Sequence, residues 1–149
     1  MNDPTRRQGA TAEEAADSTM FALIHVGRAL EARLEKALAD IGLSFAKHGV
    51  LRLLVEAGEP LPLGDLAARQ CCVRSNMTQL VDRLEAEGLV KRVADPDDRR
   101  VIRAALTPEG ERRAAAGTRE IERVRREFAA SLPEEDRATL DRLLAAITL

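Results

Sequence analysis

Residues 76–111 read NMTQLVDRLEAEGLVKRVADPDDRRVIRAALTPEGE, and this stretch decides the fold. Its first apolar residues recur at steps of three and four, which marks one face of a helix over 74–87. They are Met77, Leu80, Val81 and Leu84. Two apolar segments follow, 89–93 and 101–106, and the segment between them is dense in turn residues. The stretch therefore predicts a helix and then a β-hairpin with two adjacent arginines at its tip.

The elements on either side complete a helix-turn-helix. A short helix is expected over 63–69, and the four residues 70–73 form the turn, which is as short as this motif requires. Further out, helices are expected over 18–41 and 45–57, with Gly42 ending the first and Ser44 capping the second. After the hairpin, Thr107 and Pro108 open a helix that runs to about Ser131. The sequence SLPE at 131–134 predicts a capping box for a last helix.

Composition excludes several classes of protein. The 149 residues are 45% hydrophobic and 32% charged, which favours one folded domain over a disordered chain. With no Trp or Tyr, the chain lacks the flat rings that single-strand binding modules use for stacking. No apolar run is long enough for a membrane span, and the N-terminal residues lack a secretory apolar region. We therefore expect a cytoplasmic protein without membrane contact.

Motifs for chemistry are missing from the sequence. There is no glycine-rich phosphate loop, no HExxH and no G-x-S-x-G, and the acidic residues fall on helical faces expected to be exposed. The two cysteines and two histidines do not have the spacing of a tetrahedral metal site. We expect no enzymatic activity, no cofactor and no bound metal.

The helix over 74–87 carries residue types that suit the major groove of DNA. Once its apolar face is turned inward, its N-terminal half presents hydroxyl and amide side chains, which pair with base edges. The candidates are Ser75, Asn76, Thr78 and Gln79. Gln79 and Asn76 have the bidentate amide geometry that suits adenine. The face could instead be an ordinary solvated one, but the basic hairpin that follows favours DNA binding.

Basic residues concentrate around this helix. The whole chain has a formal net charge of −2, whereas residues 69–103 hold eight basic and six acidic side chains. Arg99 and Arg100 at the hairpin tip suit a narrow minor groove, one inserting while the other pairs with Asp95, Asp97 or Asp98. Four further cations are candidates for phosphate contacts, which set affinity and salt dependence. They are Arg74, Arg83, Lys91 and Arg92.

Residues 76–111 resemble the MarR (multiple antibiotic resistance regulator) family of winged helix-turn-helix transcription regulators. The D-P-x-D-R-R wing followed by L-T-x-x-G is the most specific part, and LVDRLEAEGLV is the next. The resemblance implies a homodimeric repressor, with Ser75, Asn76, Thr78 and Gln79 on the reading face and Arg100 as the minor-groove arginine beside Arg99. One departure is Val73, where the family often has a Ser or Thr cap; Ser75 is the alternative cap.

The expected fold is mainly α-helical with a small β-hairpin wing. Residues 1–17 form a polar tail or a helix extension, 18–43 an N-terminal dimerisation helix, 44–107 the winged DNA-binding lobe and 108–149 the C-terminal dimerisation helices. The apolar stripes of the end helices are too long for the middle lobe to cover, which independently predicts a partner copy. Two-fold symmetry predicts a pseudo-palindromic double-stranded operator with half-sites roughly 10 bp apart.

The resemblance also implies a small aromatic or anionic effector. It would bind in a cleft between the dimer helices and the lobe, and its binding would release DNA. The polar residues near this seam are His25, Arg28, His48 and Arg52. His48 and Arg52 are four residues apart and share a helical face, where two cations could bind a carboxylate. The other interpretation makes His48 a hydrogen-bonded structural residue and Arg52 an exposed ion-pair partner.

Two alternatives to an effector-controlled regulator remain open at this point. Cys71 and Cys72 lie in the turn just before a helix N-terminus, which favours thiolate, so oxidation there could control DNA binding. A packed turn would make the same cysteines small inert hydrophobes. The second alternative is a helical dimer or adaptor that binds no DNA, which explains the end helices but not the basic hairpin.

Overall fold

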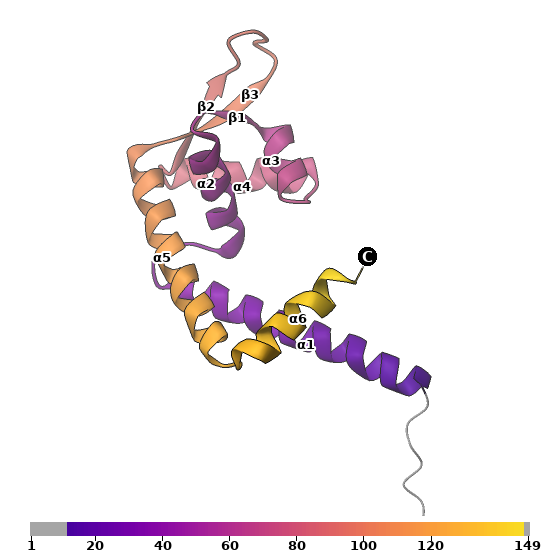
Figure 1. The fold of residues 1–149 in the computed structure, drawn as a ribbon. Helices are drawn as coiled ribbons and strands as arrows, with labels where there is room; N and C mark the ends of the chain where they lie inside the picture. Colours follow the sequence, from indigo (N-terminus) through magenta and orange to yellow (C-terminus); the bar gives the residue numbers. More distant parts are fainter. Residues whose placement is uncertain (1–11, 148–149) are drawn as a thin grey trace, which may run out of the picture. The chain divides into compact units, whose positions relative to one another are not determined.

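The structure is a computed structural model that describes residues 12–147, with side chains described from residue 17. The chain divides into two compact units, residues 1–33 and 34–149. The long helix α1, Ala12–Ala39, begins in the first unit and ends in the second (Figure 1). Residues 12–17 are therefore helical, which agrees with the helix extension, while residues 1–11 of the expected tail lie outside the described part.

The second unit contains the expected order of elements. Five helices and a small three-stranded sheet follow α1 along the described chain. The helices are α2 Phe45–Ala57, α3 Leu63–Arg69, α4 Arg74–Ala86, α5 Pro108–Ala130 and α6 Glu134–Ala145. Ser44 caps α2 by accepting a hydrogen bond from the Lys47 amide, and Gly42 before it has φ +72°, a conformation that glycine adopts without strain.

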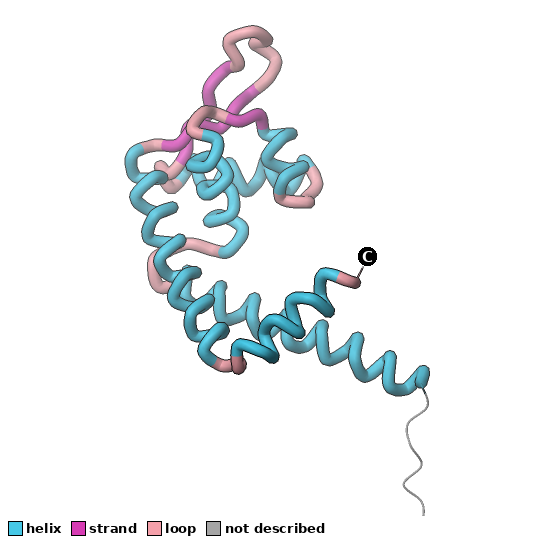
Figure 2. The backbone as a smooth tube through the Cα atoms, viewed as in Figure 1, coloured by secondary structure: helices cyan, strands magenta, loops and turns pink. Residues whose placement is uncertain are grey.

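The sheet has three antiparallel strands in the order β1-β3-β2. These are β1 Leu61–Pro62, β2 Val90–Ala94 and β3 Ile102–Leu106. The pairs Val90↔Leu106 and Ala94↔Ile102 define the β2–β3 hairpin, and Leu61↔Ala104 adds the short strand to its other edge. The hairpin and its tip loop project beyond the helices of this unit (Figure 2), as a wing does.

The core of the unit forms where α2, α3, α4 and the sheet meet. Its fully buried side chains include Leu51 and Leu54 from α2, Leu66 from α3, and Met77 and Leu84 from α4. The α2 and α5 helices also pack on each other, and α4 packs on β2. This packing fixes which face of α4 turns inward and leaves the opposite face to solvent.

The sequence TPEG at 107–110 joins the wing to α5 through several bonds. The Thr107 hydroxyl donates to the Gly88 carbonyl at 2.6 Å and accepts from the Gly110 amide at 3.0 Å, which caps α5 as predicted. A Cβ placed on Gly110 would lie 1.9 Å from the Leu89 carbonyl oxygen. The glycine of the L-T-x-x-G motif is thus explained by the close approach of two backbones.

The predicted capping box at 131–134 is wrong. Residue Pro133 takes the N-cap position of α6 and supplies no side-chain bond. The Ser131 hydroxyl instead donates to the Phe128 carbonyl at 2.7 Å, so this serine closes α5. Within residues 12–147, none of the helices has the length and apolar character needed to cross a bilayer.

Candidate nucleic-acid interface

The outer face of α4 is polar, as the sequence predicts. Met77, Val81 and Leu84 are buried, and the four predicted reading residues Ser75, Asn76, Thr78 and Gln79 are all exposed. The Thr78 hydroxyl donates to the Arg74 carbonyl at 3.0 Å, one helical turn back. The structure therefore brings these side chains together on one face of a single helix.

The start of α4 has no side-chain cap. Val73 is the N-cap residue, in an extended conformation, and its carbonyl accepts the Met77 amide at 3.2 Å. The expectation that Ser75 caps the helix is wrong, because Ser75 lies inside the first turn. Its hydroxyl is consequently not committed to the cap, and Ser75 stays a candidate for base contact.

A glutamine that sequence reasoning missed anchors the turn before α4. The Gln70 amide nitrogen donates to the Ala46 carbonyl at 3.3 Å. The same nitrogen lies 2.2 Å from where a Cβ on Gly49 would stand, so a larger residue at position 49 would displace the Gln70 side chain from this position. The sequence offers one signal for this contact, which is a glycine among the larger side chains of the helix over 45–57.

The two cysteines have different surroundings in this turn. Cys71 is exposed and has φ +51°, an unusual conformation for a residue other than glycine. Cys72 is half-buried and packs against the core. The redox hypothesis for this pair stays a prediction. Among the residues described, no three His, Cys, Asp or Glu side chains gather as a metal site would require.

The base of the wing is organised by Asp95. One of its carboxylate oxygens accepts the amides of Asp97 at 2.8 Å and Asp98 at 3.1 Å, while the other accepts Arg103 Nε. Arg103 also donates to the Pro60 carbonyl at 3.1 Å, which ties the hairpin to the segment before β1. The Asp97 amide, followed by Arg103, holds the pKa of Asp95 below its usual value.

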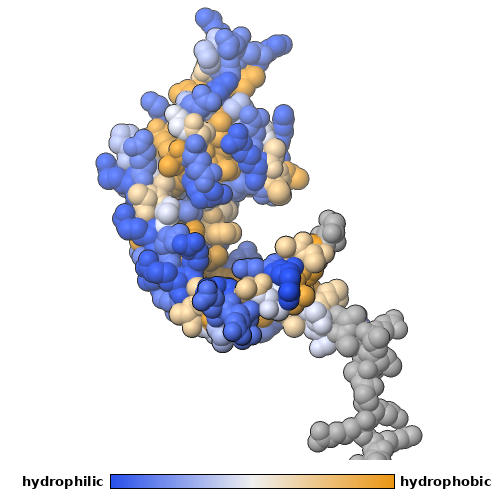
Figure 3. Space-filling model, viewed as in Figure 1, coloured by the Kyte–Doolittle hydropathy of each residue, from blue (hydrophilic) through white to orange (hydrophobic). Residues whose placement is uncertain are grey.

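At the wing tip, the arginine that pairs with a carboxylate is Arg100. Its Nε lies 3.1 Å from Asp98 Oδ1 and a terminal nitrogen lies 3.2 Å from Oδ2. The pairing with Arg100 lowers the pKa of Asp98. The Arg100 side chain is nevertheless 91% exposed, and Arg99 is exposed beside it. Figure 3 shows hydrophilic side chains over this end of the unit.

The four phosphate candidates divide into two groups. Arg74, Arg83 and Lys91 are exposed. Arg92 is half-buried and lies between two carboxylates, with a terminal nitrogen 2.6 Å from Asp82 and another 2.5 Å from Glu85. The Arg92 amide and then its side chain lower the pKa of Glu85. A phosphate would have to compete with both carboxylates for Arg92, so its contact with DNA stays a prediction with less support than the other three.

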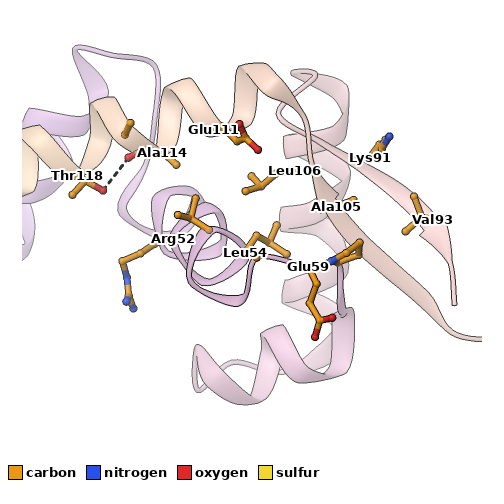
Figure 4. A pocket seen from close by; sticks show the side chains of 14 residues that line it. Arg52, Leu54, Glu59, Lys91, Val93, Ala105, Leu106, Glu111, Ala114 and Thr118 are labelled. Atoms are coloured by element: carbon orange, nitrogen blue, oxygen red, sulfur yellow. Dashed lines mark hydrogen bonds between the residues drawn. The ribbon is translucent and has the colours of Figure 1, made fainter. Parts of the chain in front are cut away.

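A cavity of about 670 Å³ lies between α2, α5 and the two wing strands (Figure 4). Its apolar lining includes Leu54, Val55 and Leu106. Four charged residues also line it, and sequence analysis named only the first of them as an effector contact: Arg52, Glu59, Lys91 and Glu111. A volume of this size is within the range that small ligands occupy.

The effector candidates do not converge on this cavity. Arg52 lines it and pairs with Glu56. His48 is buried, with Nε2 3.3 Å from the Thr118 hydroxyl and its ring against Gly117, which matches the structural interpretation. Burial and, to a lesser degree, the Arg52 charge lower the pKa of His48, although a hydrogen bond with the Ala114 backbone opposes them. His25 and Arg28 are exposed residues of the first unit.

Comparison with known proteins agrees with this arrangement. The model of the MarR family matches residues 43–102. The HTH-type transcriptional regulator YsmB of Bacillus subtilis is 34% identical over 90 residues, 60% of this chain and 61% of YsmB, so the chain spans less than two thirds of that relative. The homoprotocatechuate degradative operon repressor of Escherichia coli is 28% identical over 128 residues, 86% of each protein.

Solved structures extend the likeness over most of the chain. CouR from Rhodococcus jostii RHA1, bound to p-coumaroyl-CoA, superposes with a TM-score of 0.71 at 30% identity and covers 90% of this chain and 96% of CouR. The matched segment 43–102 holds the turn, α4 and the wing tip, which are the elements that carry the candidate interface. From its sequence and its fold, the chain belongs to the MarR family.

Proposed function

We propose that this protein is a homodimeric, sequence-specific DNA-binding transcription regulator, and that it acts as a repressor. The observation that carries the proposal is the pairing of two surfaces in one unit. The exposed hydroxyl and amide row of α4 suits a major groove, and the wing presents Arg99 and Arg100 for a minor groove. The E. coli relative is named as an operon repressor, which supports the sign of regulation.

We further propose that a small molecule controls DNA binding from the cavity beside the wing. CouR carries p-coumaroyl-CoA in its crystal structure, which supports an aromatic or anionic effector for this chain as well. The cavity is lined by Arg52 and Lys91 as possible partners for a carboxylate or phosphate, and by Val55 and Leu106 as apolar contacts. Of the four residues proposed from sequence, Arg52 is the one that lines this cavity.

Fluorescence anisotropy tests the DNA-binding proposal. Purified protein is titrated into duplex DNA from upstream of its own gene and into a scrambled duplex, each at two salt concentrations. A specific regulator binds the first duplex much more tightly, and both affinities fall as salt rises because phosphate contacts release counterions. Equal binding to the two duplexes contradicts sequence specificity, and no binding to either favours the adaptor alternative.

Removal of the Arg100 side chain from the wing tip provides a sharper test. Arg100→Ala is expected to cost about 1–3 kcal/mol of operator binding and to leave dimerisation unchanged. The matched control is Arg125→Ala, which removes another highly exposed, ion-paired arginine from the C-terminal part of α5. If Arg100→Ala binds operator as tightly as the parent protein, the wing plays no part in recognition.

A further inference from the structure

The start of α4 exposes an apolar side chain that neither the fold nor the proposed function explains. Val73 is 62% exposed. Across residues 63–86, all of which the structure describes, it is the only large hydrophobic side chain that is exposed. The neighbouring residues Arg74, Ser75 and Asn76 are exposed and polar, so Val73 stands beside the proposed reading face.

A valine at this position also gives up a common source of helix stability. It is the N-cap of α4, yet its side chain makes no cap hydrogen bond. Ser, Thr, Asp or Asn would each bond the free amides of the first turn. An isopropyl group can neither do this nor accept a hydrogen bond from a DNA base. It can make apolar contact, and the major groove offers one apolar group, the 5-methyl of thymine.

We propose that Val73 is a specificity-determining residue that packs against a thymine methyl group in each operator half-site. The inference rests on the proposed DNA-binding function, because it takes the N-terminal end of α4 as the end that enters the groove. Exposed polar residues at the same end would hold this end of the helix against the duplex. Val73 then distinguishes thymine from cytosine, which lacks the methyl group, at one base pair.

In vitro selection tests the proposal and identifies the operator sequence in the same experiment. Full-length wild-type protein and Val73→Ala are each used to enrich duplexes from a random pool. The two consensus sequences are expected to agree except at one symmetric pair of positions, where thymine is required by the wild type and any base is accepted by the variant. A wild-type consensus that Val73→Ala leaves unchanged at every position overturns the proposal.

Uracil substitution then isolates the methyl group itself. Replacing the selected thymine with deoxyuridine removes the methyl and keeps the base-pairing edge. Wild-type affinity for this duplex is expected to fall about fourfold, which corresponds to the ~0.8 kcal/mol of one buried methyl-sized group. Val73→Ala should bind the thymine and uracil duplexes equally. If the wild-type protein binds the thymine and deoxyuridine duplexes with equal affinity, the proposed contact is contradicted.

Two further variants separate reading from folding. Phe45→Ala also shortens an exposed apolar side chain, at the start of α2 and outside the lining of the cavity, and it should keep the thymine requirement. Val73→Ser should raise the melting temperature, because it supplies the missing cap, and should still lose the thymine requirement. If selection enriches no sequence even for the wild type, the proposed function fails; enrichment without a Val73-dependent thymine overturns this inference alone.

Discussion

Gly110 is the residue at which a single methyl group should do most harm. An added Cβ would lie 1.9 Å from the Leu89 carbonyl oxygen, which belongs to backbone and cannot rotate away. We expect Gly110→Ala to lower the free energy of unfolding by about 1–3 kcal/mol, as overpacking does. Urea denaturation followed by circular dichroism measures this change.

Gly64→Ala is the matched control, since it adds the same group to another helix. There the nearest atoms, 3.0 Å or more from the added Cβ, belong to the flexible end of the Arg74 side chain. Moving this side chain costs little, so stability should stay near that of the parent. Equal losses in both variants would show that the Gly110 contact is not the cause.

His48 should make the stability of the protein depend on pH. Burial is the main cause that lowers its pKa in the folded state, so the unfolded chain binds a proton more readily. The neutral ring therefore stabilises the fold fully above the unfolded pKa of about 6.5, and this contribution is lost as pH falls below that value.

Melting temperatures measured between pH 7.5 and 5 test this sign. His48→Gln should flatten the decline of stability in that window, because it removes the titrating ring from beside Thr118. His25→Gln changes the other histidine, which is exposed on α1, and should leave the decline in place. A wild-type protein that gains stability on acidification to pH 5.5 would contradict the assignment.

Among the elements, the wing depends most on one carboxylate. Asp95→Asn keeps an oxygen for the Asp97 and Asp98 amides but removes the charge that holds Arg103. We expect faster amide exchange in the tip loop and weaker operator binding, with a smaller loss than Arg100→Ala causes, because Arg100 itself is retained. Hydrogen exchange with mass spectrometry and anisotropy measure the two effects.

Asp98→Asn is a useful comparison for the same element. Asp98 pairs with Arg100 at the exposed tip and has no bond to Arg103. This change should free Arg100 without loosening the base of the hairpin. If the tip-loop amides are equally protected from hydrogen exchange in Asp95→Asn and in the parent protein, Asp95 does not organise the wing.

The elements could be predicted from sequence because their signals are local. Steps of three and four placed α4, Ser44 placed the start of α2, and Thr107 with Pro108 placed the start of α5. The contacts between elements could not be predicted in this way. Arg103 reaches Pro60, 43 residues away, and the cavity takes its walls from α2, α5 and the wing strands. The local signal also failed once. The capping-box motif assigned the N-cap of α6 to Ser131, but Pro133 occupies that position.

For the whole molecule, exposed apolar side chains predict a dimer. Two helices carry most of them: Met20, Phe21, Leu23, Ile24 and Val26 on α1, and Leu143 and Leu144 on α6. Each buried leucine is worth about 1.5–3 kcal/mol, so an uncovered stripe is a strong drive to association. We expect the protein to remain dimeric at low nanomolar concentration, as measured by mass photometry or fluorescence correlation.

A double change on α6 tests this association. Leu143→Glu with Leu144→Glu should produce monomers and abolish tight operator binding, because each monomer would reach only one half-site. Arg142→Glu also adds a negative charge to an exposed position of α6, and it should leave the dimer intact. A monomeric wild type at micromolar concentration would contradict the prediction.

The position of the cavity has a consequence for how such a regulator can diversify. Its lining comes from α2, the segment 58–60, β2, β3 and α5, and no residue that the structure describes on α3 or α4 contributes to it. Apart from Lys91, which is also a candidate phosphate contact, substitutions in the lining can therefore accumulate without altering the residues proposed to read DNA. If a small molecule controls DNA binding as proposed, a collection of variants with new inducers could share one promoter, and the chain would then suit the design of biosensors.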